Sequence, residues 1–220
     1  MSPAPKTAAV VLSGCGHMDG AEVRESVLAL LALDREGVVV QCFAPDIAQA
    51  HVVDHLTGRP EAGTRNVLVE SARIARGRVR PLSDLVAAEF DMLVCPGGFG
   101  AAKNLSNLAA AGADAQLLPD FLAVIVAFRA LNRPICVICI TPAVLVAGLG
   151  EGEVTTGDDP DTAGMIYSMG GTHVKAPVTH CHVDRVHRVV STPAYMYSNA
   201  RLADVAKGID AAVHATVALA

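Results

Sequence analysis

Cys139 is the residue of this sequence best placed for nucleophilic chemistry. It follows a buried apolar run, 134–138, and Pro142 then suits the first turn of a helix. A cysteine at such a strand-to-helix corner projects from the backbone, and the positive end of the helix dipole favours its thiolate. The backbone N–H of Ile140 is then free to bind an oxyanion. The pattern indicates a nucleophile elbow, although a small buried cysteine at a strand end looks the same in sequence.

A second chemical feature is the glycine turn at residues 96–100, which follows another apolar run, 92–95. Adjacent glycines let the backbone turn its N–H groups toward one point, which makes a cradle for an anion or oxyanion. Gly97 and Phe99 of this turn are expected to contact the substrate. A tight turn that needs only conformational freedom is an equally good interpretation of the glycines.

Two carboxylates, Glu22 and Glu25, begin the first predicted helix and share one face because they are three residues apart. Carboxylates at a helix start often only complement the helix dipole. Glu25, however, lies among apolar residues such as Val27 and Leu28, so we expect it to be partly buried. A buried, protonated glutamate can hydrogen-bond a thiolate and move protons. The sequence leaves open which glutamate contacts Cys139.

Histidines and glycine motifs give weaker signals. The loop at 13–20 fails the spacing of a dinucleotide-binding motif, since position 19 is Asp, so no nucleotide cofactor is expected. His17 in this loop is a candidate for substrate contact. His180 and His182 alternate on a predicted strand, yet no acidic or thiol ligand has a suitable spacing, so we predict no metal site.

These residues need a scaffold, and the pattern of apolar runs supplies one. Predicted strands alternate with predicted helices and have continuous rather than alternating apolar residues, which is typical of a parallel sheet covered on both faces. In such a sheet the ligand site lies beyond the carboxyl ends of the strands. The strands are expected at 8–13, 38–43, 92–95, 134–138 and 183–191, the last pairing with preceding residues, and the helices at 21–36, 66–76, 119–131 and 201–217.

Composition limits the class of protein. The 220 residues are 52% hydrophobic and 18% charged with a net charge of −5, which excludes a disordered chain and argues against nucleic acid or an anionic membrane as a partner. No apolar run is long enough to span a bilayer.

The apolar run at 8–12 is too short for a signal-peptide core, so we expect a cytosolic protein with mostly reduced, buried cysteines. No linker divides residues 1–220, which predicts a single α/β domain.

Six sequence blocks resemble the ThiJ/PfpI superfamily of class I amidotransferase-like folds, and within it the ElbB-type isoprenoid-biosynthesis family. The resemblance runs nearly end to end. The blocks are Leu12–Gly16, Cys42–Asp46, Asn66–Arg76, Pro96–Asn104, Asp158–Thr162 and Thr192–Met196.

The resemblance implies a flavodoxin-like three-layer sandwich with Cys139 as nucleophile, Glu25 as its acidic partner, and Gly98 and Ile140 as oxyanion donors. It also implies a homodimer and cofactor-free glyoxalase or deglycase activity on a small aldehyde. Superfamily members often carry a histidine before a proline, where this chain has Asp159. Asp159 is therefore expected at the substrate site, but it cannot act as a neutral imidazole base.

Three hypotheses of function follow. The leading one is a glyoxalase III-type lyase that converts 2-oxoaldehydes such as methylglyoxal to hydroxy acids through Cys139. The second is a redox-responsive or partner-binding regulator that uses the same thiol. The third is a thiol hydrolase or glutaminase, which needs a base that the sequence does not reveal.

Overall fold

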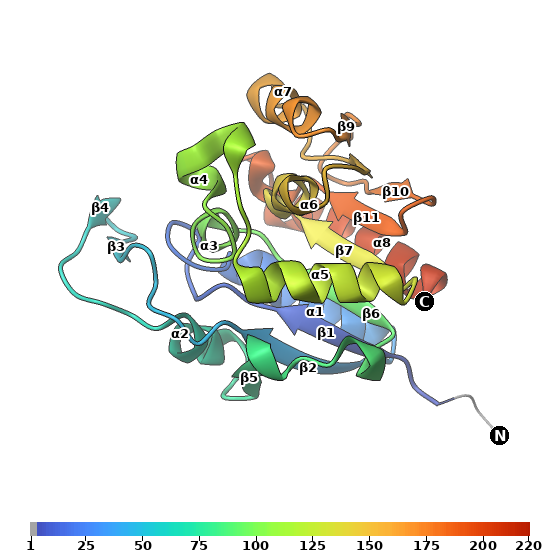
Figure 1. Ribbon diagram of the computed structural model, residues 1–220, viewed down its shortest axis with the longest axis horizontal. Helices are drawn as coiled ribbons and strands as arrows, with labels where there is room; N and C mark the ends of the chain where they lie inside the picture. Colours follow the sequence, from blue (N-terminus) through green and yellow to red (C-terminus); the bar gives the residue numbers. More distant parts are fainter. Residues whose placement is uncertain (1–3) are drawn as a thin grey trace.

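The computed structural model describes residues 4–220, so residues 1–3 of the predicted domain lie outside the described residues. Its centre is a seven-stranded sheet in the order β10-β11-β7-β6-β1-β2-β5, in which every pairing is parallel except that of β10 with β11 (Figure 1). The strands are β1 (Thr7–Val11), β2 (Val39–Ala44), β5 (Val79–Pro81), β6 (Met92–Cys95), β7 (Ile135–Ile138), β10 (His182–Asp184) and β11 (Val189–Thr192). The predicted α/β, flavodoxin-like sandwich is confirmed.

Helices cover both faces of this sheet. They are α1 (Val23–Arg35), α2 (Val67–Ile74), α3 (Phe99–Lys103), α4 (Leu108–Ala111), α5 (Pro119–Ala130), α6 (Thr141–Leu149), α7 (Pro160–Ser168) and α8 (Leu202–Leu219). Two small sheets lie outside the central one, β3 (Val53–Asp54) with β4 (Arg59–Pro60), and β8 (Glu153–Val154) with β9 (Thr172–His173).

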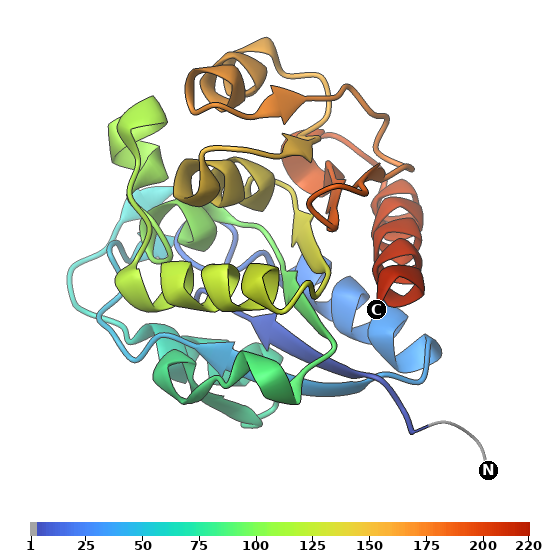
Figure 2. The ribbon, with the colours of Figure 1, turned by 45° about the vertical axis from the view of Figure 1, so that its right-hand side comes forward.

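The two faces bury separate apolar clusters. On one face, α5 and α6 pack against alternate strand residues, with Phe121 and Phe128 fully buried. On the other face, α1 and α8 lie side by side and bury Leu33 and Ile209 (Figure 2). Because both faces are covered, the central strands β6 and β7 are apolar at every position, which contributes to the high hydrophobic content.

Local signals set the helix ends. The Asn66 side chain accepts a hydrogen bond from the backbone N–H of Val69 at 3.0 Å, so α2 starts where a capping residue occurs. Pro119 opens α5 at a position that needs no N–H donor. These signals explain why the predicted helices agree with the observed ones to within about two residues.

The C-terminal strand differs from its prediction. The single strand expected at 183–191 is wrong, because residues 185–188 form a turn that makes an antiparallel hairpin of β10 and β11, with Arg188 at a φ of 54°. His180 lies before β10, so His180 and His182 do not share a strand face as expected. Among residues 4–220 no group of three or more His, Cys, Asp or Glu side chains can hold a metal ion.

No helix formed by residues 4–220 has both the length and the apolar character that crossing a membrane requires. All six cysteines are free thiols. The carboxyl ends of β1, β6 and β7 meet at one edge of the sheet, and the chemical residues described above follow these strands.

Candidate active site

The corner at Cys139 has the geometry of a nucleophile elbow. Cys139 lies directly after β7 with a φ of 64°, a left-handed conformation that is uncommon for a residue with a side chain. Its backbone N–H donates to the carbonyl of Thr192 at 2.9 Å, and α6 begins two residues later. The hydroxyl of Thr141 donates to the carbonyl of Pro96 at 3.0 Å, which ties this corner to the glycine turn. The backbone thus holds the thiol in one strained position.

Glu25 is the glutamate that reaches the thiol. Its side chain is fully buried in the first turn of α1, and its carboxyl group and the Cys139 thiol interact directly. One carboxyl oxygen accepts from the N–H of Gly97 at 3.0 Å, and the other accepts from the N–H of Tyr195 at 3.2 Å. Glu22 instead caps the helix, accepting from the N–H of Glu25 at 2.6 Å. The two carboxylates therefore have different roles.

Burial dominates the electrostatics of this pair. Desolvation, followed by the nearby Glu22 carboxylate, raises the pKa of Glu25 to about 8. Burial, followed by the charge of Glu25, raises the pKa of the Cys139 thiol above its usual range, while the N–H groups of Gly98 and Ile140 lower it. At pH 7 Glu25 carries a proton, so its charge no longer opposes thiolate formation. The two N–H groups then remain as stabilisers of negative charge at the sulfur.

A cavity of about 370 Å³ opens onto the thiol. The predicted site residues His17, Gly98, Phe99, Cys139 and Ile140 all line it, so loops after β1, β6 and β7 meet in one place as expected. Cys139 is only 7% exposed, which leaves access to its sulfur through this cavity. This volume lies near the lower end of the range for pockets that bind small molecules.

Gly97 and Asp159 differ from the other predicted substrate contacts. A Cβ on Gly97 would lie 2.4 Å from Cys139 Cβ and 2.7 Å from a Glu25 carboxyl oxygen, so this position lies behind the reactive pair. Asp159 caps α7, accepting from the N–H of Thr162 at 2.8 Å and from its hydroxyl at 2.5 Å. The structure does not bring Asp159 to the cavity wall, because its carboxylate is occupied by the cap, and Thr162 lines the cavity instead.

A second, outer cavity of about 500 Å³ adjoins the first and shares His17, Glu22 and Tyr195 with it. Arg24 lines it and donates to the Tyr195 hydroxyl at 3.2 Å. His55 lines it as well, and packs edge-on against His17 with ring centroids 5.1 Å apart. Arg24, the imidazoles of His17 and His55, and the Glu22 carboxylate thus line the outer cavity at the entrance to the site.

The comparisons with known proteins agree with this geometry. No protein-family model matches the chain. The human protein "glutamine amidotransferase-like class 1 domain-containing protein 3, mitochondrial" is 44% identical over 202 residues, which cover 87% of this chain and 75% of the human protein. The rat ES1 protein homolog, also mitochondrial, is 42% identical over 206 residues, covering 89% of this chain and 77% of the rat protein. The chain belongs to this ES1 family of glutamine amidotransferase-like class 1 domain proteins.

Solved structures place the ES1 family within a larger fold group. The crystal structure of an isoprenoid biosynthesis protein with an amidotransferase-like domain from Ehrlichia chaffeensis has a TM-score of 0.92 and 45% identity, covering 97% of this chain and 99% of that one. The predicted relationship to ElbB-type isoprenoid-biosynthesis proteins and to class I amidotransferase-like folds is confirmed. The predicted relationship to the ThiJ/PfpI superfamily holds at the level of the fold, which a DJ-1 superfamily protein from Salmonella typhimurium shares at 22% identity. Glyoxalase III from Candida albicans shares the fold at a TM-score of 0.61, with 12% identity over 96% of this chain and 97% of that one.

The cytosolic location expected from the sequence is contradicted by these relatives, since the human and rat ES1 proteins are mitochondrial. That expectation rested on the short apolar run at 8–12, which argues only against a secretory signal.

Three cavity residues escaped the sequence reasoning: Thr162, Tyr195 and Met196. Each lies in a block that marked the family resemblance, so the blocks were a usable signal. Thr162 was missed because it lies in α7, outside the central sheet. Tyr195 and Met196 follow β11, whose end the sequence did not locate because it predicted one strand at 183–191. Ala194, beside Tyr195, has a φ of 44°, a second left-handed residue next to the reactive pair.

Proposed function

We propose that this protein is a cofactor-independent, glyoxalase III-like enzyme that converts small 2-oxoaldehydes to 2-hydroxy acids. The observation that carries the proposal is the buried pair of Cys139 and Glu25 in a small cavity with two backbone N–H donors at the sulfur. Glyoxalase III shares the fold, but at 12% identity that likeness supports the fold alone.

The first step joins the thiol to the aldehyde. The Cys139 sulfur forms a bond to the aldehyde carbon, the C=O double bond becomes a single bond, and the oxygen takes up the proton that the thiol loses. The N–H groups of Gly98 and Ile140, which face the sulfur, are placed to stabilise the negative oxygen as it forms. The product is a hemithioacetal.

Glu25 then moves a proton between neighbouring carbons. In its ionised state it removes the hydrogen from the hemithioacetal carbon, giving an enediol, and returns a proton to the adjacent carbon. The result is a thioester of the 2-hydroxy acid, which water hydrolyses to release the acid and restore the thiol. A pKa of about 8 suits this role, because both protonation states of Glu25 are accessible near neutral pH.

The test is formation of lactate from methylglyoxal by the purified protein without glutathione. We expect turnover that Cys139→Ala and Glu25→Gln each reduce by at least a hundredfold. Cys181→Ala, which removes a partly exposed thiol outside the cavity, should retain activity. Lactate formation by Cys139→Ala at the wild-type rate would refute the proposal.

The structure gives less support to the two alternatives. A thiol hydrolase or glutaminase needs a histidine base, and within residues 4–220 no histidine is hydrogen-bonded to Cys139, although His17 shares its cavity. A redox-responsive regulator requires an accessible thiolate, whereas burial raises the pKa of the Cys139 thiol. Mild peroxide followed by mass spectrometry separates this alternative, which requires oxidation of Cys139 before the other cysteines.

The proposal extends to the assembly and the biological context. The family resemblance implies a homodimer, and the apolar face of α8 is not available for it because this face packs within the chain. α1 instead exposes an apolar stripe of Val23, Val27 and Leu31 at helical spacing, which suits a second copy. Light scattering would show a mass twice that of the chain.

Because the Ehrlichia relative is an isoprenoid biosynthesis protein, we include a link to isoprenoid metabolism in the proposal.

A further inference from the structure

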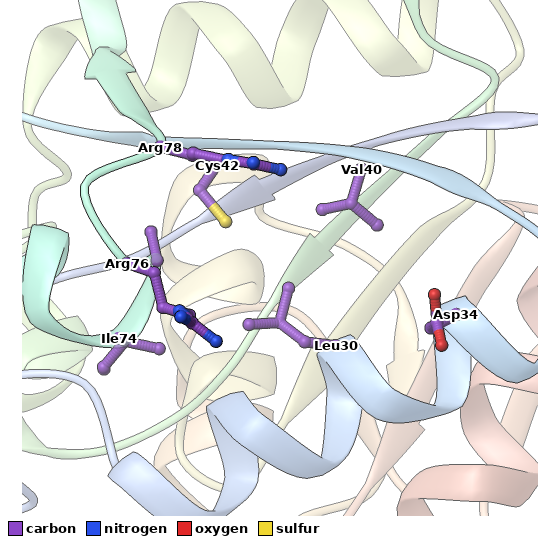
Figure 3. Close-up of a pocket in the computed structure, with 8 residues that line it drawn as sticks. Leu30, Asp34, Val40, Cys42, Ile74, Arg76 and Arg78 are labelled. Carbon is purple, nitrogen blue, oxygen red and sulfur yellow. The ribbon is translucent and has the colours of Figure 1, made fainter.

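A cavity of about 660 Å³ lies between α1, α2 and β2 and is formed by other residues than those around Cys139. Its floor is apolar and is built by Leu30, Val40, Cys42 and Ile74 (Figure 3). Burial raises the pKa of the Cys42 thiol to about 11, so the floor carries no charge at neutral pH. The floor therefore suits a hydrocarbon group.

Two arginines give this cavity a cationic end. Arg76 and Arg78 extend their side chains over the apolar floor from the turn between α2 and β5, and Asp34 lies at the opposite end (Figure 3). Neighbouring arginines are already paired: Arg73 donates to Glu70 at 2.9 Å. Arg76 and Arg78 form no ion pair with a carboxylate within residues 4–220.

The backbone at Arg76 is unusual as well. Arg76 follows the C-cap of α2 with a φ of 52°, in the left-handed conformation that glycine normally supplies at this place. An arginine here has a conformational cost relative to glycine, because its Cβ crowds the backbone in this conformation. The next residue, Gly77, has a φ of 79°, so the glycine follows one position after the place where it usually ends a helix. Arg76 occupies that place, and its side chain lines the cavity.

We propose that this cavity binds a phosphate monoester of a short apolar alcohol. The phosphate would lie between the guanidinium groups of Arg76 and Arg78, since two arginines match one doubly charged group. The hydrocarbon would cover Leu30, Val40 and Ile74. Asp34 at the far end disfavours ligands with a second negative group there.

Isothermal titration calorimetry with hexyl phosphate tests this site. We expect binding that the double variant Arg76→Gln/Arg78→Gln weakens at least tenfold. Arg73→Gln, which alters a paired arginine of the same segment, should bind like the wild type, and Cys139→Ala should too, which separates this site from the proposed active site. Circular dichroism melting shows whether each variant is folded.

Four results would overturn the proposal. The first is equal binding of hexyl phosphate by the double variant. The second is binding of inorganic phosphate as tight as that of hexyl phosphate, which would mean an adventitious ion only. The third is binding of hexanol as tight as that of hexyl phosphate, which would remove the role of the arginines. The fourth is a change in molecular mass of the double variant in light scattering, because a second copy of the chain would then be the occupant.

Discussion

Replacing Glu25 with glutamine separates the chemical role of this residue from its effect on stability. Glu25 is fully buried, and its pKa rises from an ordinary value of 4.5 to about 8 in the folded protein. Because the folded state holds the proton of Glu25 more tightly than the unfolded state, the contribution of Glu25 to the free energy of unfolding is greatest below pH 4.5. This contribution falls as the pH rises from 4.5 and levels off above about 8.

The size of this effect follows from the two pKa values. One pH unit corresponds to about 1.4 kcal/mol, so the wild type should lose about 4 kcal/mol of stability through Glu25 between pH 5 and pH 8.5. Glutamine does not titrate, and Glu25→Gln should lack this loss. Its absolute stability is less informative, because glutamine has one acceptor oxygen where the N–H groups of Gly97 and Tyr195 need two.

Urea denaturation of both proteins at pH 5 and pH 8.5 measures the effect, and the titration of all other groups cancels in the difference. Cys139→Ala is the matched control: burial is the first cause of the shift at Glu25, so this variant should keep most of the pH dependence. Equal pH dependence of the wild type and Glu25→Gln would refute the inference that Glu25 is protonated in the folded protein at neutral pH.

Three other substitutions test single contacts. Gly97→Ala should destabilise the fold by about 1–3 kcal/mol and reduce turnover at least tenfold, because the new Cβ would lie 2.4 Å from Cys139 Cβ. Gly164→Ala is the control in the same thermal melts, and it should stabilise the fold slightly because the space around Gly164 in α7 is open. Asp159→Ala should lower the free energy of unfolding by about 1 kcal/mol through loss of the helix cap, while KM stays unchanged. A large rise in KM would instead support the substrate contact that the sequence predicted for Asp159. Arg24→Gln removes the hydrogen bond to Tyr195 and should raise KM severalfold in steady-state kinetics with little change in kcat.

The sequence was sufficient for the four strands β1, β2, β6 and β7 and for the centre of the site. Apolar runs without alternation predicted buried parallel strands, and in such a sheet the ends of β1, β6 and β7 must adjoin. This topology is why the contact between Gly98 and Cys139 was predictable although the two residues are 41 positions apart in the sequence. The same reasoning could not choose between Glu22 and Glu25, because both occupy the first turn of α1 and only the packing decides which one points inward.

The entrance to the site was not predictable in this way. His55 reaches it from a long excursion between β2 and α2, and Tyr195 reaches it from a turn after β11. Neither segment has a periodic pattern that fixes its place, since loop positions depend on tertiary contacts. The hairpin at β10 and β11 was missed for a related reason: its turn, with Arg188 at a positive φ, contains no glycine or proline to mark it.

The excursion at residues 46–66 contributes no strand to the central sheet, and Figure 1 shows its β3–β4 hairpin standing apart from the layers. It is fastened by a few hydrogen bonds, from the N–H of Val53 to Asp19 at 2.8 Å and from the N–H of Ala50 to Asn104 at 2.9 Å. Within this segment Ile47 packs against the core, and the rest of it belongs to neither core cluster, so that part can lengthen, shorten or change composition while the reactive pair stays in place. Proteins with the same reactive pair can therefore differ in the ligands that enter their cavity. Exchange of this one segment is a direct way to engineer ligand selectivity.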